Sequence, residues 1–280
     1  IAGLETIEKG ELYIGGKLMN EVLPKYRDVA MVFQSYALYP HMIVEENIGY
    51  PLKMKGVKGQ EKTDAILRAA KQVQLEDLLN RYPKQLSGGQ RQQVAVGRAL
   101  MTQPKVLMLD EPMASLDRAL RDRLLADISD LLRNLNQAAI YVTHDHDEAF
   151  SIADQIAIMH EGKIERIGSP NEVWLDPGSE SSARCIGHEN LINLDASGNC
   201  ALGKLGSGSG TVLIREDGIS IVSETTEIVG EVKSAIFHAG RTLIKVAIGD
   251  IELSTSTTEP VKISDRVNLH LSHSAVVPLS

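Results

Sequence analysis

Cysteine is scarce in this sequence, with only Cys185 and Cys200 among 280 residues. The two do not form a CxxC pair, so the sequence predicts neither a disulfide framework nor a zinc site. Both are expected to be small buried or idle thiols.

Positive charge is scarce as well: the sequence has 29 Lys and Arg and 37 Asp and Glu, which gives a net charge of −8 at pH 7. Nucleic acids and anionic membranes attract basic surfaces, so this balance argues against both as direct partners. No apolar run is long enough to span a membrane, and no signal peptide opens the chain. We therefore expect a cytoplasmic protein that reaches a membrane only through a partner, and no nucleic-acid partner.

The stretch from Leu86 to Leu100 joins a helix start to a pair of glycines. Ser87 stands where a helix N-cap belongs, and Gln90 occupies the capping-box position after it, which predicts a helix. Gly88 and Gly89 carry no side chain that would block the unpaired N–H groups of the helix start, so a phosphate can approach them. An ordinary capped helix after a turn is the alternative.

Two apolar runs are predicted to be buried strands of a parallel sheet. One runs from Val106 to Leu109 and ends in the carboxylates Asp110 and Glu111. The other begins at Ala139 and ends at His144. A salt-bridged surface pair is the alternative for the two acids, and a metal site with His146 is the alternative for the histidine.

In this order along the chain, these segments resemble the motifs of the ATP-binding-cassette (ABC) ATPases, and the chain is identified as a member of that family. The Leu86–Leu100 stretch resembles the signature motif, and the aromatic-rich flank after Gln34 resembles the importer ATPases among them. The other matches are Gln34 with the Q-loop, Val106–Pro112 with the Walker B strand, Ser115–Asp117 with the D-loop and Ala139–Asp145 with the H-loop.

The resemblance implies an α/β fold, a P-loop NTPase-like ABC core with a helical subdomain at about 45–100, over residues 1–180. Gln60–Leu79 is predicted to be an amphipathic helix of that subdomain. A linker is expected at 176–182, and a small all-β, OB-like (TOBE-type) domain over 190–280. Its predicted strands are Val212–Arg215, Ile228–Ile236, Thr242–Ile248, Ile251–Thr255 and Val267–Leu271.

The resemblance also implies roles in ATP hydrolysis, with ATP and Mg²⁺ as the bound groups. Asp110 and Gln34 would hold the metal shell, Glu111 would orient the attacking water, and His144 would contact the γ-phosphate. Gln34 would also link this centre to the membrane subunit. The residues that would close over nucleotide bound to the opposite subunit of a head-to-tail dimer are Ser87, Gly88, Gly89, Gln90 and Asp117.

The phosphate-binding run G-x-x-x-x-G-K-[ST] does not occur in the 280 residues. Gly15-Gly16-Lys17 is better explained as a hairpin turn. We therefore expect that the chain cannot bind ATP alone. Paired with an intact subunit, it would lend its Ser87–Gln90 loop to the partner's nucleotide.

The leading hypothesis is the ATP-hydrolysing subunit of an ABC importer, peripheral on the inner face of the cell membrane. Its partners would be transmembrane permease subunits, a second ATPase subunit and, indirectly, a solute-binding protein outside the membrane. The alternatives are a non-catalytic scaffold or regulatory subunit and an ABC ATPase of DNA repair or translation, which the acidic charge opposes. Sugars, polyamines, iron(III) and oxyanions are the candidate solutes, with a slight preference against sugars.

Overall fold

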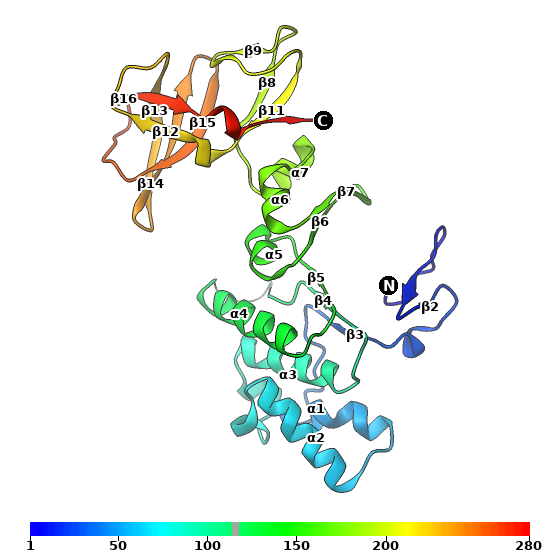
Figure 1. Ribbon diagram of the computed structural model, residues 1–280. Coiled ribbons are helices and arrows are strands. Elements are labelled where there is room, and N and C mark those ends of the chain that lie inside the picture. Colours follow the sequence, from blue (N-terminus) through cyan, green and yellow to red (C-terminus); the bar gives the residue numbers. More distant parts are fainter. Residues whose placement is uncertain (114–117) are drawn as a thin grey trace. The chain divides into compact units, whose positions relative to one another are not determined.

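A computed structural model describes residues 1–113 and 118–280 (Figure 1). The contacts divide the chain into two compact units, Ile1–Ile152 and Ala153–Ser280. Within the described residues, no helix is both long and apolar enough to cross a bilayer.

The first unit is built on a three-stranded parallel sheet in the order β3-β4-β5. Leu107 and Leu109 on the central strand are fully buried, as its apolar run predicts. The prediction of a second buried strand is wrong for β5, where Ile140 and Val142 are 36% and 50% exposed. Among the described strands β5 is an outer one, bonded only to β4. The bounds are β3 Val29–Val32, β4 Val106–Asp110 and β5 Ala139–Val142.

Helices α1, α2 and α3 pack on one another below this sheet in Figure 1 and form the helical subdomain. The predicted apolar face of α2 is confirmed, since Ile66, Ala69 and Ala70 are buried. The helix ends earlier than predicted because Gln74 adopts a left-handed backbone, with φ of 56°. The bounds are α1 Val44–Met54, α2 Gly59–Gln72, α3 Gly88–Leu100, α4 Arg118–Asn134 and α5 His146–Ile152.

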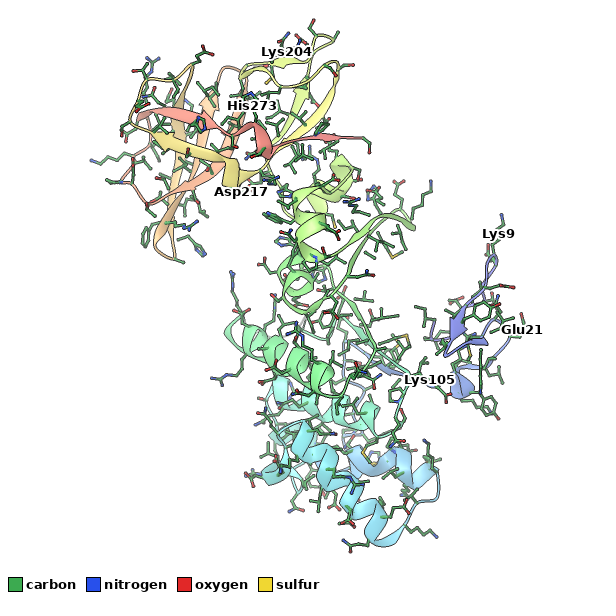
Figure 2. All side chains as sticks on the ribbon, viewed as in Figure 1. Lys9, Glu21, Lys105, Lys204, Asp217 and His273 are labelled. Carbon is green, nitrogen blue, oxygen red and sulfur yellow. The ribbon has the colours of Figure 1, made fainter. Side chains whose placement is uncertain are left out.

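The glycine pair near the start of the chain forms the predicted hairpin turn between β1 (Tyr13–Ile14) and β2 (Lys17–Leu18). Gly15 and Gly16 have φ of 56° and 76°, the left-handed conformation that a two-residue hairpin loop requires. A Cβ at Gly15 would also collide with the side chain of Lys105, labelled in Figure 2.

The second unit begins with the hairpin β6 (Ile156–His160) and β7 (Lys163–Gly168), followed by α6 (Pro170–Leu175) and α7 (Glu180–Cys185). The predicted linker at 176–182 is wrong in its second half. Ser182 and Ala183 are fully buried because α7 packs against β6 and against β11 (Gly210–Ile214). The contacts divide the chain after Ile152, whereas the extent of the ABC core to residue 180 stays a prediction.

Three antiparallel sheets complete the described part of the second unit. One has five strands in the order β12-β16-β13-β14-β15, one has three in the order β17-β11-β8, and one is the short pair β9-β10. Alternate residues such as Val232, Val246 and Leu269 point into a shared core. All five predicted strand runs are confirmed. The bounds are β8 Leu191–Leu194, β9 Asn199–Cys200, β10 Gly203–Lys204, β11 Gly210–Ile214, β12 Ile219–Val222, β13 Ile228–His238, β14 Arg241–Ile248, β15 Ile251–Thr257, β16 Arg266–Leu271 and β17 Val276–Leu279.

A carboxylate on β7 ties this strand to the start of α7. Glu165 accepts hydrogen bonds from the hydroxyls of Ser179, Ser181 and Ser182. These bonds, that from Ser179 first, lower the pKa of Glu165 from 4.5 to about 2. The folded state therefore gains stability from the ionised carboxylate above pH 4.5, and this gain is lost as the pH falls through about 2.

We expect Glu165→Gln to lower the melting temperature of the full chain at pH 7. The difference from wild type should shrink as the pH is lowered to 3, because the wild-type carboxylate then loses its advantage over the amide. Thermal unfolding followed by circular dichroism measures both. Glu161→Gln, at the exposed turn of the same hairpin, is the control. A difference that stays constant with pH would contradict the assigned pKa.

Candidate functional site

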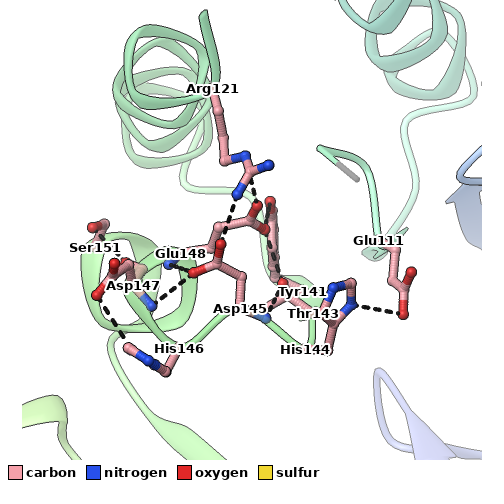
Figure 3. Close-up of polar contacts among 10 residues, drawn as sticks. All are labelled: Glu111, Arg121, Tyr141, Thr143, His144, Asp145, His146, Asp147, Glu148 and Ser151. Carbon is pink, nitrogen blue, oxygen red and sulfur yellow. Dashed lines mark hydrogen bonds and ion pairs between the residues drawn. The ribbon is translucent and has the colours of Figure 1, made fainter. Parts of the chain in front are cut away.

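Three side chains from three neighbouring strand ends meet at one edge of the parallel sheet. Glu111 follows β4 directly, and its Oε1 lies 3.2 Å from Nδ1 of His144, which follows β5 (Figure 3). Its other oxygen, Oε2, accepts a hydrogen bond of 3.4 Å from Nε2 of Gln34, which follows β3. The carboxyl ends of parallel strands share an edge, where sites of α/β proteins form. The Glu111 carboxylate thus bridges the two other predicted residues.

Glu111 holds this position in an unfavourable backbone conformation. Its φ is 44°, a left-handed value that costs a non-glycine residue roughly 1–2 kcal/mol. Its N–H donates to the carbonyl of Val142 at 2.9 Å, which continues the β4–β5 ladder by one residue. Such outliers persist where surrounding structure enforces them, and they concentrate at functional sites.

Oxygen atoms at the same edge of the sheet are suited to bind a small hard cation. Asp110 ends β4 and is half-buried. The Gln34 amide uses its nitrogen on Glu111, so its carbonyl oxygen is the atom suited to a cation. One carboxylate and one amide oxygen, completed by waters and phosphate oxygens, are a set that Mg²⁺ accepts.

The alternative metal site at the histidines finds no support in the geometry. His144 contacts Glu111, whereas His146 Nδ1 lies 3.2 Å from Asp147. Among the residues that the structure describes, no three His, Cys, Asp or Glu side chains gather around a common point suited to a metal.

The start of α3 has the predicted capping box. The Ser87 hydroxyl accepts from the Gln90 N–H at 3.2 Å, and the Gln90 side chain accepts from the Ser87 N–H at 3.0 Å. The helix begins at Gly88, so its first N–H groups belong to the two glycines and point out of its end. The predicted D-loop residues Ser115, Leu116 and Asp117 lie outside the described residues.

Gly89 has a packing role that the sequence did not reveal. A Cβ at this residue would lie 2.5 Å from Cδ1 of Leu124 on α4, and Leu124 is only 3% exposed. The absence of a side chain therefore lets the start of α3 approach α4, in addition to leaving its N–H groups accessible.

We expect Gly89→Ala to lower the free energy of unfolding by about 1–2 kcal/mol, because overpacking outweighs the gain in helix propensity. In a Leu124→Ala background the same change should become stabilising, since the new methyl group fills the vacated space. Chemical denaturation of the four chains of this cycle measures both effects. Equal effects in the two backgrounds would show that Leu124 does not set the requirement for glycine.

A polar network beside His144 was not predicted from the sequence (Figure 3). Its centre is Glu148, whose side chain is 4% exposed and accepts from the hydroxyls of Tyr141 and Thr143, both at 2.9 Å. Burial, and then the Glu148 charge, raise the pKa of Tyr141 above its ordinary value, so the phenol stays a donor. Asp145 and Glu148 have the spacing of a capping box at the start of α5, a signal that could have located them.

Comparison with known proteins gives a consistent family. Residues 1–114 match the family model described as ABC transporter. The sn-glycerol-3-phosphate import ATP-binding protein UgpC of Rhodopseudomonas palustris is 46% identical over 228 residues, covering 80% of this chain and 63% of that protein. The maltose/maltodextrin import ATP-binding protein MalK of Mannheimia succiniciproducens is 50% identical over 191 residues, covering 68% and 51%.

A solved structure extends the likeness to the fold. The ATP-binding cassette MJ0796, in a dimeric post-hydrolysis state bound to ADP and Pi, matches with a TM-score of 0.53 and 30% identity. The match covers 61% of this chain and 77% of that one. The chain spans 51–63% of the length of the two curated relatives above.

Proposed function

The chain belongs to the ABC transporter family, as an ATP-binding subunit of the importer type, and we propose that it binds and hydrolyses ATP to drive solute uptake across the cytoplasmic membrane. The observation that carries the proposal is the convergence of Gln34, Glu111 and His144 at the sheet edge. Phosphoryl transfer to water depends on positioning and on charge neutralisation. This trio offers the positioning, and the neutralisation would come from a bound cation.

Each residue of the trio has a distinct task in this proposal. Glu111 orients the attacking water and accepts its proton, as a carboxylate held by two donors can do. His144, whose side chain is 75% exposed, presents its ring to the γ-phosphate. Asp110 and the Gln34 carbonyl would hold Mg²⁺, which supplies charge neutralisation when bound.

The start of α3 acts on the nucleotide of the opposite subunit in a head-to-tail dimer. The unpaired N–H groups at this helix start can donate to phosphate oxygens, and Gly88 has no side chain that would block the approach of a phosphate. Ser87 and Gln90 hold the loop in shape through their capping box. A composite site also needs a phosphate-binding loop, a motif that these 280 residues do not contain. Hydrolysis at Gln34, Glu111 and His144 therefore requires such a loop in addition to the residues given.

The flank of Gln34 supports docking to transmembrane permease subunits. Tyr36 and Ala37 both have left-handed backbones, with φ of 61° and 46°. Arg98 of α3 holds this turn by donating to the two carbonyls at 3.1 and 2.8 Å. The turn, which follows Gln34, is thereby tied to the signature helix, so a permease helix seated on it would sense the nucleotide site. In this proposal the protein is a peripheral protein on the inner face of the membrane, where it is bound to the permease.

The names of the relatives bear on the solute. One is named for the import of sn-glycerol 3-phosphate and the other for the import of maltose and maltodextrin, which are all hydroxylated solutes. We therefore favour a sugar or a phosphorylated polyol, against the slight preference stated from the sequence. A solute-binding protein would deliver it to the permease.

Reconstitution with the permease and a second ATPase subunit tests the proposal and separates it from the scaffold alternative. ATP hydrolysis and solute uptake are measured for wild type, Glu111→Gln and Ser87→Asp. Aspartate keeps the N-cap and places a negative charge against the phosphates. If this chain hydrolyses ATP, Glu111→Gln removes the activity of its own site. If Ser87→Asp lowers ATP hydrolysis and Glu111→Gln does not, the hydrolysis occurs at the partner subunit's nucleotide. The chain then only contributes its signature loop to that site and is a scaffold.

A further inference from the structure

The backbone on both sides of His144 is held by side chains that do not touch the histidine ring (Figure 3). The Asp145 N–H donates to the hydroxyl of Thr143 at 3.0 Å, which closes a turn across His144. The same hydroxyl donates to Glu148 at 2.9 Å. Oδ1 of Asp145 accepts from the N–H of Asp147 at 3.0 Å and caps α5.

Arg121 connects this turn to a separate helix. From α4, its Nη1 donates to Oδ2 of Asp145 at 2.7 Å, and its Nε lies 3.5 Å from Oε1 of Glu148. The three side chains are between 4% and 28% exposed, so solvent screens these charges only in part. One guanidinium thus pairs with two carboxylates, through a hydrogen bond to Asp145 and a longer ion pair with Glu148.

The histidine ring itself has little to hold it. It is 75% exposed, and Glu111 is the partner that the described residues provide for it. Its distance from Glu111 therefore depends on the backbone between Thr143 and Asp145. Without Arg121, the carboxylates of Asp145 and Glu148 would lose the cation that pairs with both of them among the described residues, and their repulsion would shift that backbone.

We propose that Arg121 and Glu148 are positioning residues for His144, which set its contact with Glu111 and with the γ-phosphate from outside the nucleotide site. The inference rests on the proposed function of the Gln34, Glu111 and His144 site. The same contacts would couple α4 to His144, because a shift of α4 relative to α5 would be passed through Arg121 to the backbone that carries the histidine.

The test compares Arg121→Met and Arg121→Lys in the reconstituted transporter. We expect Arg121→Met to lower kcat by about 10- to 100-fold, because small misplacements of a catalytic group cost that much. KM for ATP should stay within about twofold, since Arg121 does not reach the nucleotide. Arg121→Lys should recover part of kcat, as lysine can pair with one of the carboxylates. Arg123→Met, an exposed arginine on the same helix, is the matched control.

A double-mutant cycle with His144→Ala shows whether Arg121 acts through the histidine. If it does, Arg121→Met lowers kcat in the wild-type background and adds nothing in the His144→Ala background. Equal losses in both backgrounds, or an unchanged kcat, would overturn the proposal. Should Arg121→Met fail to fold, Arg121→Lys takes its place in the cycle.

A readout without turnover separates this inference from the proposed function. The ring Cε1–H signal of His144, assigned by its loss in His144→Ala, should shift in the NMR spectrum of Arg121→Lys and not in that of Arg123→Met. If wild type hydrolyses no ATP, the proposed function fails while this shift still decides the inference. If wild type hydrolyses ATP and the signal does not move, only the inference fails.

Discussion

Glu111→Gln is expected to reduce ATP hydrolysis by this subunit's site by about 100-fold or more, the size of a lost general base. The amide has nearly the same shape as the carboxylate, but it cannot take a proton from water. It also has a single acceptor oxygen, whereas Glu111 offers one oxygen to Gln34 and the other to His144. The new amide nitrogen would then lie against another nitrogen, either Nε2 of Gln34 or Nδ1 of His144, in place of a carboxylate oxygen.

Nucleotide binding should survive this change, because the Glu111 side chain contacts Gln34 and His144 and its proposed task is to orient the attacking water. We expect the affinity for a fluorescent ATP analogue to change by less than about threefold while kcat falls, a pattern that marks an interaction made in the transition state. Steady-state hydrolysis and equilibrium binding by the reconstituted transporter measure the two quantities.

The matched control is Glu161→Gln. Glu161 is also left-handed, with φ of 47°, and it lies at the exposed turn between β6 and β7. A comparable loss in this control would mean that the effect comes from replacing a glutamate in a strained backbone. If Glu111→Gln hydrolyses ATP at the wild-type rate while Ser87→Asp still lowers that rate, ATP hydrolysis takes place in the site of the partner subunit.

Gln92→Met is expected to raise the free energy of unfolding by about 1–3 kcal/mol, the cost of leaving buried polar groups unpaired. Gln92 lies on α3 and is fully buried, and neither its Nε2 nor its Oε1 has a hydrogen-bond partner among the described residues. Methionine has a similar length and no groups that need a partner, so it keeps the packing and removes the penalty.

Chemical denaturation of the full chain measures this change, with Gln93→Met as the control. Gln93 is the next residue of the same helix and is only half-buried, so its amide can reach water. We expect its replacement to change stability by less than about 0.5 kcal/mol. A loss of stability in Gln92→Met would show that the amide has a partner in solution, such as a buried water.

The strands and caps were predictable because their signals are local. The alternating runs over Thr242–Ile248 and Ile251–Thr255 match β14 and β15, and the Ser87–Gln90 pattern matches the start of α3. In these cases a few neighbouring residues decide the backbone, through side-chain periodicity or through a bond between a side chain and a nearby N–H.

Predictions of burial were less reliable. Ile140 and Val142 are apolar and yet exposed, whereas Ser182 is polar and fully buried. Exposure depends on what packs against a segment, and the hydropathy of the segment itself does not report that. For this reason β5 was expected to be buried, and part of α7 was assigned to a linker.

The sequence by itself determined the family, the order of the motifs and the residues Gln34, Glu111 and His144 as a candidate site. Only the tertiary structure decided how these residues are held. Gln34 and Glu111 are 77 positions apart, and Arg121 and Asp145 are 24 apart, so no local pattern relates them. Their contacts arise because parallel strands end at one edge and because α4 and α5 pack on each other, and this proximity is a property of the folded chain.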